Sequence, residues 1–461
     1  MTAQTTRRRP LREGSAYMLA LMLLVVFSAL AAAMATTSNL SLQKSSNHRS
    51  SSSAQLTAES GMEFLLERLS TVRLPASTTE ASFPANLKTA LDKAINASNL
   101  ANQSIVSTTG GVAVPAISAA GGSFTSSMLW STSNRCRLTV RGAHSGVART
   151  IRMDVVLIPK NATAFDYGLA SRGPITISGN ATITGVNNPQ EASVVSSTTA
   201  ANAITVDGNV VLSGDLGASA ENANVAITGH PSIAGSTDPA VYSQHIHFGV
   251  AEPDFPEINI APLAALANGI VIDSHTNTSG ALVFNNARIK AGTNPTFSSK
   301  VTINGVLLVE APNVVKFEGQ TVLNGFVAAE NTSSALSDCQ LRFSGGVEAY
   351  GVDALPASDP QFTAVRQKSG TFIVAPGFGV TFGGNFSTIN GSIAADQLTF
   401  TGTAEGTVKG SVIGLKDLPT FVGGNVDIRV DRKGADANPT GFLKPYALKA
   451  VSASYAEVTG G

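Results

Sequence analysis

An uncharged segment close to the N-terminus constrains this chain more than any other feature. Residues 16–35 read AYMLALMLLVVFSALAAAMA and contain no charged side chain. At 1.5 Å of rise per residue, a helix of this length spans about 30 Å, the thickness of the hydrocarbon core of a bilayer. By the positive-inside rule, basic residues before such a segment stay cytoplasmic and the chain after it is exported. The basic residues here are Arg7, Arg8, Arg9 and Arg12.

Three interpretations of this segment are open: a retained single-pass anchor, a secretory signal cleaved after Ala35, and a membrane helix that continues into an exported helix. The small-x-small pattern at Ala33 and Ala35 fits cleavage. However, a signal core usually has about 7–15 residues, and neither proline nor glycine occurs between Ser15 and Ser60. We therefore favour a retained helix. Its anchoring residues would include Ala16, Leu19, Leu23, Val26, Leu30 and Ala35.

The segment after the apolar run predicts a small α+β unit. Residues 55–72 are apolar at helical spacing, and an amphipathic helix is expected to end before Pro75. Residues 135–140 and 150–158 alternate with period two around a turn-rich stretch, which predicts a β-hairpin. Between them the chain is poorly patterned: we expect one short helix over 87–100, and loops at Gly110 and at Gly121.

Beyond Asp166 the sequence repeats. An apolar-x-Gly triplet is followed six residues later by a second Gly, and each unit predicts strand, turn and strand. Stacked units can bury apolar stripes that one unit cannot, which favours a right-handed parallel β-helix over a β-sandwich or a propeller. The paired glycines are Gly179 and Gly185, Gly208 and Gly214, Gly229 and Gly235, and Gly319 and Gly325.

These patterns together give a fold class that is mainly β. A transmembrane and amphipathic helix comes first, followed by a small α+β head and then a parallel β solenoid. The expected divisions are a basic leader (1–14), a transmembrane helix (15–37), a stem and head (38–165), the repeat domain (166–430) and a C-terminal tail (431–461). Within the repeats, 245–267 is expected to be an excursion containing a short helix, because Pro253 and Pro256 interrupt any strand.

Composition excludes some functions and weakens others. Charged residues are 13% of the chain and the formal net charge is zero, so we expect no nucleic-acid partner. The only cysteines, Cys136 and Cys339, could form a bridge in an exported protein, but two unpaired thiols are favoured because the two lie in different predicted domains.

Candidate catalytic and metal-binding residues are few. His245 and His247 could share one face of a strand, with acidic residues nearby to complete a metal site, although locally hydrogen-bonded histidines in a loop are the favoured interpretation. The acidic residues considered are Glu252, Asp254 and Glu257. The scattered carboxylates Asp207, Asp215 and Glu318 are interpreted as solvated turn residues rather than as the acids of a polysaccharide-cleaving enzyme.

Other motifs also argue against catalysis. Gly377, Gly379 and Gly383 resemble a phosphate loop but lack a following helix, and no nucleophile elbow is present. We therefore expect neither enzymatic activity nor a cofactor.

The N-terminal seventy residues resemble the N-terminal module of PilX-type minor pilins and related pilus-assembly proteins. The resemblance rests on the basic lead, the sequence REGSA at 12–16, the Ala- and Leu-rich helix, and QLTAESGME at 55–63. The segment 376–414 is similar to uncharacterised bacterial β-helix domains that follow such an N-terminus. The resemblance implies processing between Gly14 and Ser15. Leu19, however, stands where processed pilins carry a glutamate, which is a departure from the family pattern.

These observations predict a non-enzymatic subunit anchored in the bacterial inner membrane, with a cytoplasmic N-terminus and its bulk in the periplasm or at the cell surface. Expected partners are membrane lipid, other pilin or pilus-assembly subunits, and a glycan or surface protein. The alternatives are a secreted β-helix enzyme acting on polysaccharide and a self-polymerising scaffold.

Overall fold

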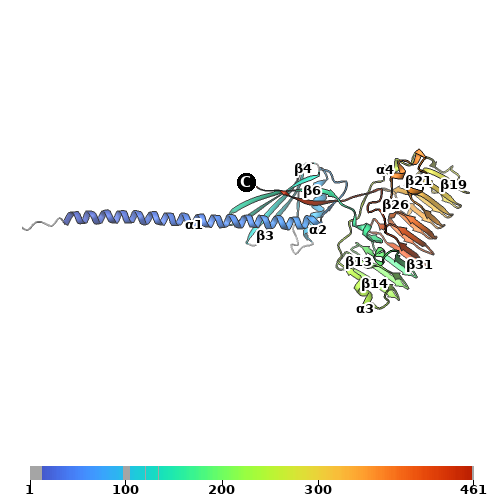
Figure 1. Cartoon of the computed structure of the whole chain (residues 1–461), viewed down its shortest axis with the longest axis horizontal. Coiled ribbons are helices and arrows are strands. Elements are labelled where there is room, and N and C mark those ends of the chain that lie inside the picture. Colours follow the sequence, from blue (N-terminus) through green and yellow to red (C-terminus); the bar gives the residue numbers. More distant parts are fainter. Residues whose placement is uncertain (1–12, 97–103, 120, 133, 459–461) are drawn as a thin grey trace, which may run out of the picture. The chain divides into compact units, whose positions relative to one another are not determined.

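The computed structural model describes residues 13–96, 104–119, 121–132 and 134–458 of the 461-residue chain (Figure 1). Two compact units are present. Unit 1 consists of 1–74, 78–158 and 447–461, and unit 2 consists of 75–77 and 159–446. Unit 2 is thus inserted in the chain between two parts of unit 1. The four arginines of the leader lie outside the described residues.

Unit 1 is built on a single unbroken helix, α1, which runs from Glu13 to Thr71 over 59 residues. The predicted continuity of the apolar and amphipathic segments is therefore confirmed. A second helix, α2 (Phe83–Asn96), covers most of the predicted short helix. The sheet of unit 1 has the strand order β1-β34-β6-β5-β4-β3-β2. Its strands are β1 Arg73–Leu74, β2 Val106–Thr108, β3 Gly111–Ala119, β4 Gly122–Thr132, β5 Arg135–His144, β6 Val147–Pro159 and β34 Tyr446–Val458.

The predicted hairpin is confirmed as β5 and β6, which pair antiparallel from Arg135↔Val156 to His144↔Val147. A two-residue turn joins them, and both of its residues, Ser145 and Gly146, have positive φ, which suits the twist of a tight hairpin. One face of the hairpin, including Leu138 and Ile151, is fully buried. The period-two pattern therefore identified the core face correctly.

Helix α1 packs on this sheet through small side chains. Ala54 and Ala58 are fully buried, and a Cβ on Gly142 of β5 would lie 2.3 Å from the Ala54 carbonyl oxygen and 2.4 Å from the Ala58 nitrogen. The helix and the strand can approach this closely only because position 142 has no side chain. Farther along α1, Met62, Leu65 and Leu69 continue the buried face at helical spacing.

Two parts of unit 1 differ from expectation. Strands β2, β3 and β4 lie where the sequence looked unpatterned, since Pro115 falls inside β3 and the pairing of β3 with β4 shifts between Val114 and Ile117. The C-terminal stretch expected as a tail instead supplies β34, which lies between β1 and β6 in the sheet. A strand that pairs with such distant segments leaves no local sequence signal.

Unit 2 contains a 25-stranded sheet in which strands of consecutive repeats pair in parallel. Strand β8 pairs with β11 and β11 with β14, while β9, β12 and β15 form a second ladder, and β7, β10, β13 and β16 a third. The strands before the excursion are β7 Leu169–Ser171, β8 Ile175–Gly179, β9 Thr182–Gly185, β10 Val194–Ser196, β11 Asn202–Gly208, β12 Val211–Leu212, β13 Leu216–Ala218, β14 Asn224–Gly229, β15 Ser232–Ile233 and β16 Ile246–Phe248.

After the excursion the parallel pairing resumes and returns to the first strands. Strands β30, β31 and β32 pair with β7, β8 and β9, so the chain enters unit 2 in the middle of the ladders and its first and last strands are neighbours. The Lys160 amide donates to the Pro445 carbonyl at 2.9 Å, which joins the two ends of the unit. The later strands are β18 Val271–Ile272, β19 Leu282–Ile289, β20 Thr296–Phe297, β21 Val301–Glu310, β22 Asn313–Phe317, β23 Thr321–Glu330, β24 Cys339–Phe343, β25 Val347–Ala349, β26 Thr371–Phe382, β27 Phe386–Asn390, β28 Ser392–Phe400, β29 Glu405–Lys409, β30 Val412–Gly414, β31 Thr420–Gly424 and β32 Asp427–Val430.

The apolar-x-Gly triplets align in register across these ladders. Five phenylalanines from successive strands form one buried column, with neighbouring ring centroids 4.7–5.3 Å apart. Val422, Ile177 and Val206 continue the column with aliphatic side chains. The phenylalanines are Phe297, Phe317, Phe343, Phe382 and Phe400.

The repeat glycines are required for two reasons. Gly179, Gly208 and Gly229 have positive φ and pair with one another, and a Cβ on Gly208 would lie 2.5 Å from the Gly179 carbonyl oxygen. Gly235 and Gly325 also have positive φ. Gly185, Gly214 and Gly319 do not, but a Cβ on each would lie within 2.4 Å of a backbone atom.

The excursion covers an outward-facing row of apolar side chains. Its first part continues the repeats, because β16 pairs in parallel with β13, so the excursion starts after 248 rather than at 245. Beyond it, Phe255 and Leu263 share one buried cluster with Val374 and Ile413, which lie two strands apart in the third ladder with Ala394 between them. The predicted short helix is α4 (Ala261–Ala264); strand β17 (Glu257–Ile258) pairs with β33 (Phe442–Leu443), and helix α3 spans Pro239–Tyr242.

Candidate functional site: an exposed apolar helix and a histidine–aspartate cluster

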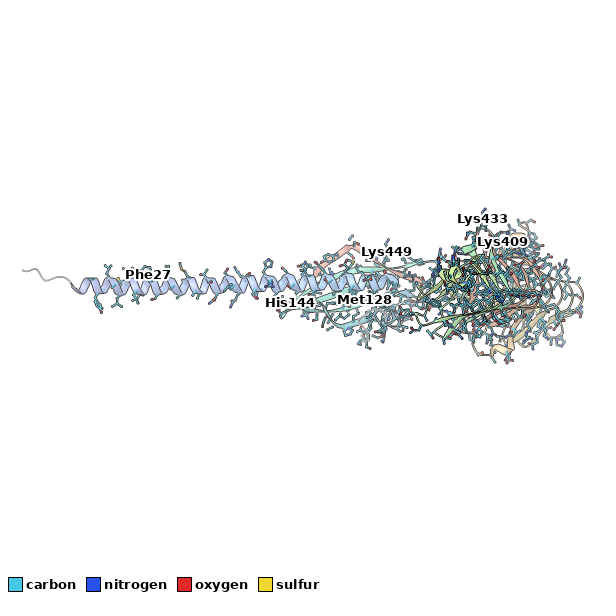
Figure 2. The ribbon with its side chains drawn as sticks, turned by 90° about the horizontal axis from the view of Figure 1, so that it is seen from below. Phe27, Met128, His144, Lys409, Lys433 and Lys449 are labelled. Carbon is cyan, nitrogen blue, oxygen red and sulfur yellow. The ribbon has the colours of Figure 1, made fainter. Side chains whose placement is uncertain are left out.

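The first part of α1 exposes apolar side chains continuously. Leu19, Val26 and Leu30 are 63%, 61% and 51% exposed, and Phe27 projects from the helix where no other described element of unit 1 lies beside it (Figure 2). Ala16, Leu23 and Ala35 are also exposed. The helix is long and apolar enough to cross a membrane by length and composition, a test that a signal sequence near the N-terminus also passes.

Three hydroxyl groups in this part of α1 donate to carbonyls of the same helix. Ser28 Oγ donates to the Leu24 carbonyl at 2.7 Å, and Thr36 and Thr37 both donate to the Ala33 carbonyl. Side chains that bond to the preceding turn do not need water, so these residues are compatible with a lipid environment. Gly14 and Ser15, the predicted processing residues, lie inside the first turn of α1.

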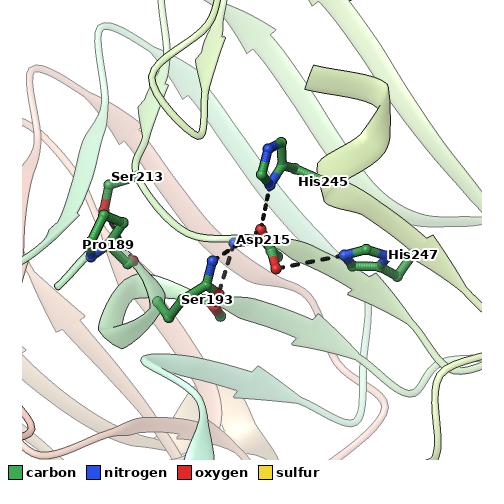
Figure 3. Close-up of polar contacts among 7 residues, drawn as sticks. Pro189, Ser193, Ser213, Asp215, His245 and His247 are labelled. Carbon is green, nitrogen blue, oxygen red and sulfur yellow. Dashed lines mark hydrogen bonds and ion pairs between the residues drawn. The ribbon is translucent and has the colours of Figure 1, made fainter. Parts of the chain in front are cut away.

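The two candidate histidines converge on an aspartate from an earlier strand (Figure 3). His245 Nδ1 lies 2.8 Å from Asp215 Oδ1, and His247 Nε2 lies 3.5 Å from Asp215 Oδ2. Parallel pairing explains the contact: Asp215 precedes β13 and His245 precedes β16, and these strands pair Leu216↔Ile246. Sequence reasoning missed Asp215 as the partner because 30 residues separate it from His245.

These contacts make Asp215 a stronger acid than an ordinary aspartate. Partial burial by itself would raise the pKa of Asp215, but hydrogen bonds from His245 and Gln190 and the nearby histidine charges outweigh it and lower the pKa. The side chain is 28% exposed. The cluster is therefore a local structural clamp between consecutive strands of one ladder.

A pH titration can test this clamp. A carboxylate whose pKa is lower in the folded protein stabilises the fold at pH values above its ordinary pKa. That contribution is lost as the pH falls through the pKa of the folded state. Asp215→Asn should therefore lower the stability of unit 2 near neutral pH and abolish part of its acid dependence, read from pH-dependent hydrogen exchange of β13 and β16. If the wild type and Asp215→Asn showed the same pH dependence of exchange in β13 and β16, Asp215 would not act as a clamp between these strands.

The structure does not bring the other metal candidates to the histidines. Glu257 accepts hydrogen bonds from the amide and hydroxyl of Ser77, at 3.0 and 3.3 Å. Across the described residues, no group of three or more His, Cys, Asp or Glu side chains is placed to hold a metal ion. The glycines at 377, 379 and 383 lie in or directly after strand β26, without a following helix.

Both cysteines are free and buried, each in the core of its own unit. Burial, with a smaller contribution from the charge of Asp154, raises the pKa of Cys136 to about 12. Burial also raises the pKa of Cys339. Neither thiol is set up to react.

Comparisons with known proteins add little. No family model matches the chain, and no curated protein is similar to it. Among solved structures, the competence-associated pilin ComZ from Thermus thermophilus is similar over 89% of this chain and 97% of that chain, with 12% identity and a TM-score of 0.25.

Proposed function

We propose that this chain is a non-enzymatic, membrane-anchored subunit of the type IV pilus or pseudopilus class, with its bulk exported. One observation carries the proposal: α1 is a single helix whose first part is apolar and exposed and whose second part is buried on an antiparallel sheet. A helix built this way can hold a folded domain to a membrane or to a filament core. Leu19 in place of the acidic residue of processed pilins favours a tip, initiating or stand-alone position.

We further propose that unit 2 is a parallel β-helix that serves as the displayed part. Its support is the in-register pairing of consecutive repeats and the continuous column of buried side chains. A stacked structure of this kind is rigid along its ladders, which suits a projecting domain for surface adhesion or pilus assembly. Its proposed partners are other pilus subunits, and a glycan or a surface protein.

Anchoring predicts a specific fractionation result. The full-length chain should pellet with inner membranes and resist carbonate extraction, whereas Val26→Arg should shift it toward the soluble fraction, because an arginine at the centre of a membrane helix costs about 2.5–3.5 kcal/mol. Leu42→Arg is the matched control: Leu42 is an exposed residue of the same helix outside the uncharged run, and the variant should stay in the membrane.

The N-terminus of the mature protein tests the same proposal independently. An uncut chain, or one beginning at Ser15, agrees with a retained anchor. A mature chain that begins at Thr36 and is freely soluble would refute it and would favour a secreted protein.

A further inference from the structure

An open groove of about 640 Å³ crosses the strands of the third ladder in unit 2. Several of the residues that line it occupy matching positions on consecutive strands. Asp396 follows Ala395, and Ala395 pairs with Ala375 on one side and with Gly414 on the other. Gly414 in turn pairs with Ser171, the residue before Arg172. Glu330 ends β23, which pairs with β26. With strands about 4.8 Å apart, Glu330, Asp396 and Arg172 follow one another at roughly 10 Å intervals.

Asp396 is the residue in this groove that the fold does not explain. It is only 8% exposed, and within the described residues its Oδ1 atom has no hydrogen-bond partner. Its carboxylate accepts one bond from the backbone of Gly377. A buried carboxylate oxygen without a donor destabilises a folded protein, so its presence needs a reason outside the free fold.

We propose that this groove binds an extended oligosaccharide that carries no acidic groups, and that a hydroxyl or amine of the sugar donates to Asp396 Oδ1. The site deepens the proposed displayed role of unit 2, and its biological meaning rests on that role. The binding itself is a property of the groove and does not depend on the anchor.

The chemistry of the lining selects this ligand class. Four carboxylates face two cations, Arg172 and Lys416, so the groove favours donors and disfavours anionic sugars. Hydroxyl groups stand beside the charges: Thr198 donates to Asp417 at 2.8 Å. The four carboxylates are Glu252, Glu330, Asp396 and Asp417.

The backbone of the ladder argues against an extended peptide as the occupant. Strand β28 pairs with β26 on one side and with β30 on the other, and β30 pairs with β7. Each of these strands already has a neighbour on both sides, so no free edge is available for strand addition at this position. Side chains alone meet the ligand, as in sugar recognition by hydrogen bonds.

Arg172 is held in place for such a role. Its guanidinium carbon lies 4.6 Å from the centre of the Phe255 ring, and Phe255 is buried in the segment that covers the neighbouring apolar row. A cation stacked on an aromatic ring presents its donors in a fixed direction. The groove therefore has a fixed donor two strands away from its unpaired acceptor.

The test uses the full-length protein in detergent micelles and isothermal titration calorimetry with three hexasaccharides: cellohexaose, the hexamer of glucosamine, and hexagalacturonate. At least one of the first two should bind, and hexagalacturonate should bind at least ten-fold more weakly. Asp396→Asn should lose at least ten-fold in affinity, because its amide must turn its oxygen to Gly377 and so presents a donor in place of the acceptor. Glu330→Gln, an exposed lining change, should weaken binding less.

Thermal unfolding separates a ligand site from a structural role. Asp396→Asn removes a buried carboxylate oxygen that has no hydrogen-bond partner and keeps the bond to Gly377, so it should leave the melting temperature of the free protein unchanged or higher. Asp207→Asn, an exposed residue of β11 outside the groove, is the matched control and should change neither binding nor melting. The proposal is overturned if none of the three sugars binds at millimolar concentration, if the uronate binds best, if Asp396→Asn binds like the wild type, or if Asp396→Asn melts markedly lower. A failure of the fractionation test leaves these results standing.

Discussion

Phe343→Ala is expected to destabilise unit 2 by about 3–5 kcal/mol. Phe343 is 2% exposed, and its ring stacks between Phe317 at 4.7 Å and Phe382 at 5.1 Å, with interplanar angles of 4° and 10°. Removing the ring leaves a cavity between two rings held in place by backbone pairing on both sides, so the column cannot close around the gap. For a unit of this size the change corresponds to a fall in melting temperature of about 10 °C.

Hydrogen exchange can locate the effect of this substitution. Amides of β22, β24 and β26, whose residues form this part of the column, should lose protection before those of β11 and β14 in the aliphatic part. Phe248→Ala is the matched control, because Phe248 is 51% exposed on β16, and it should change stability by less than about 0.5 kcal/mol. Equal effects of the two substitutions would show that the aromatic column contributes nothing beyond surface packing.

The sequence predicted those features of unit 2 that repeat. The apolar-x-Gly triplets specify which residue enters the core and which must leave room for the backbone of the next strand. Ile177, Val206 and Phe317 could therefore be assigned to the core without a structure. The order of the strands in space could not be predicted. The first strand, β7, lies in the middle of the ladders, and the chain later resumes at β18 and runs back until β30 pairs with β7. Neither placement has a local sequence signal, because every repeat unit has the same pattern.

The candidate sites also differ in whether their sequence signal is local. The apolar segment of α1 is visible because its signal is local. Asp215 was invisible as the partner of His245, since the two meet only through the register of β13 on β16, although aligning the repeats would have placed them side by side. Asp396 was missed for a different reason: its sequence neighbourhood is an ordinary strand, and only burial without a partner distinguishes it.

Gly142→Val is expected to separate the stem helix from its sheet, at a cost of about 3 kcal/mol or more. Position 142 has no positive φ, so the cost is steric and not a matter of backbone strain. The new Cβ would lie 2.3 Å from the Ala54 carbonyl oxygen, and neither the helix backbone nor the middle of β5 can yield locally. Helix α1 must therefore move away, and Ala54 and Ala58 lose the contacts that bury them.

Ala143→Val is the matched control for this substitution, since Ala143 is the next residue of β5, only half-buried, and points to the other face of the sheet. Hydrogen exchange of 54–69 in α1 should rise strongly for Gly142→Val and stay unchanged for Ala143→Val. If the amides of α1 were equally protected from exchange in both variants, close packing at Gly142 could not be what holds the helix on the sheet. Ala54, Ala58 and Gly142 lie close to the first contact of α1 with the sheet, the hydrogen bond from Arg149 to Ser51, so their packing helps to fix where the exposed part of the helix ends and the folded head begins.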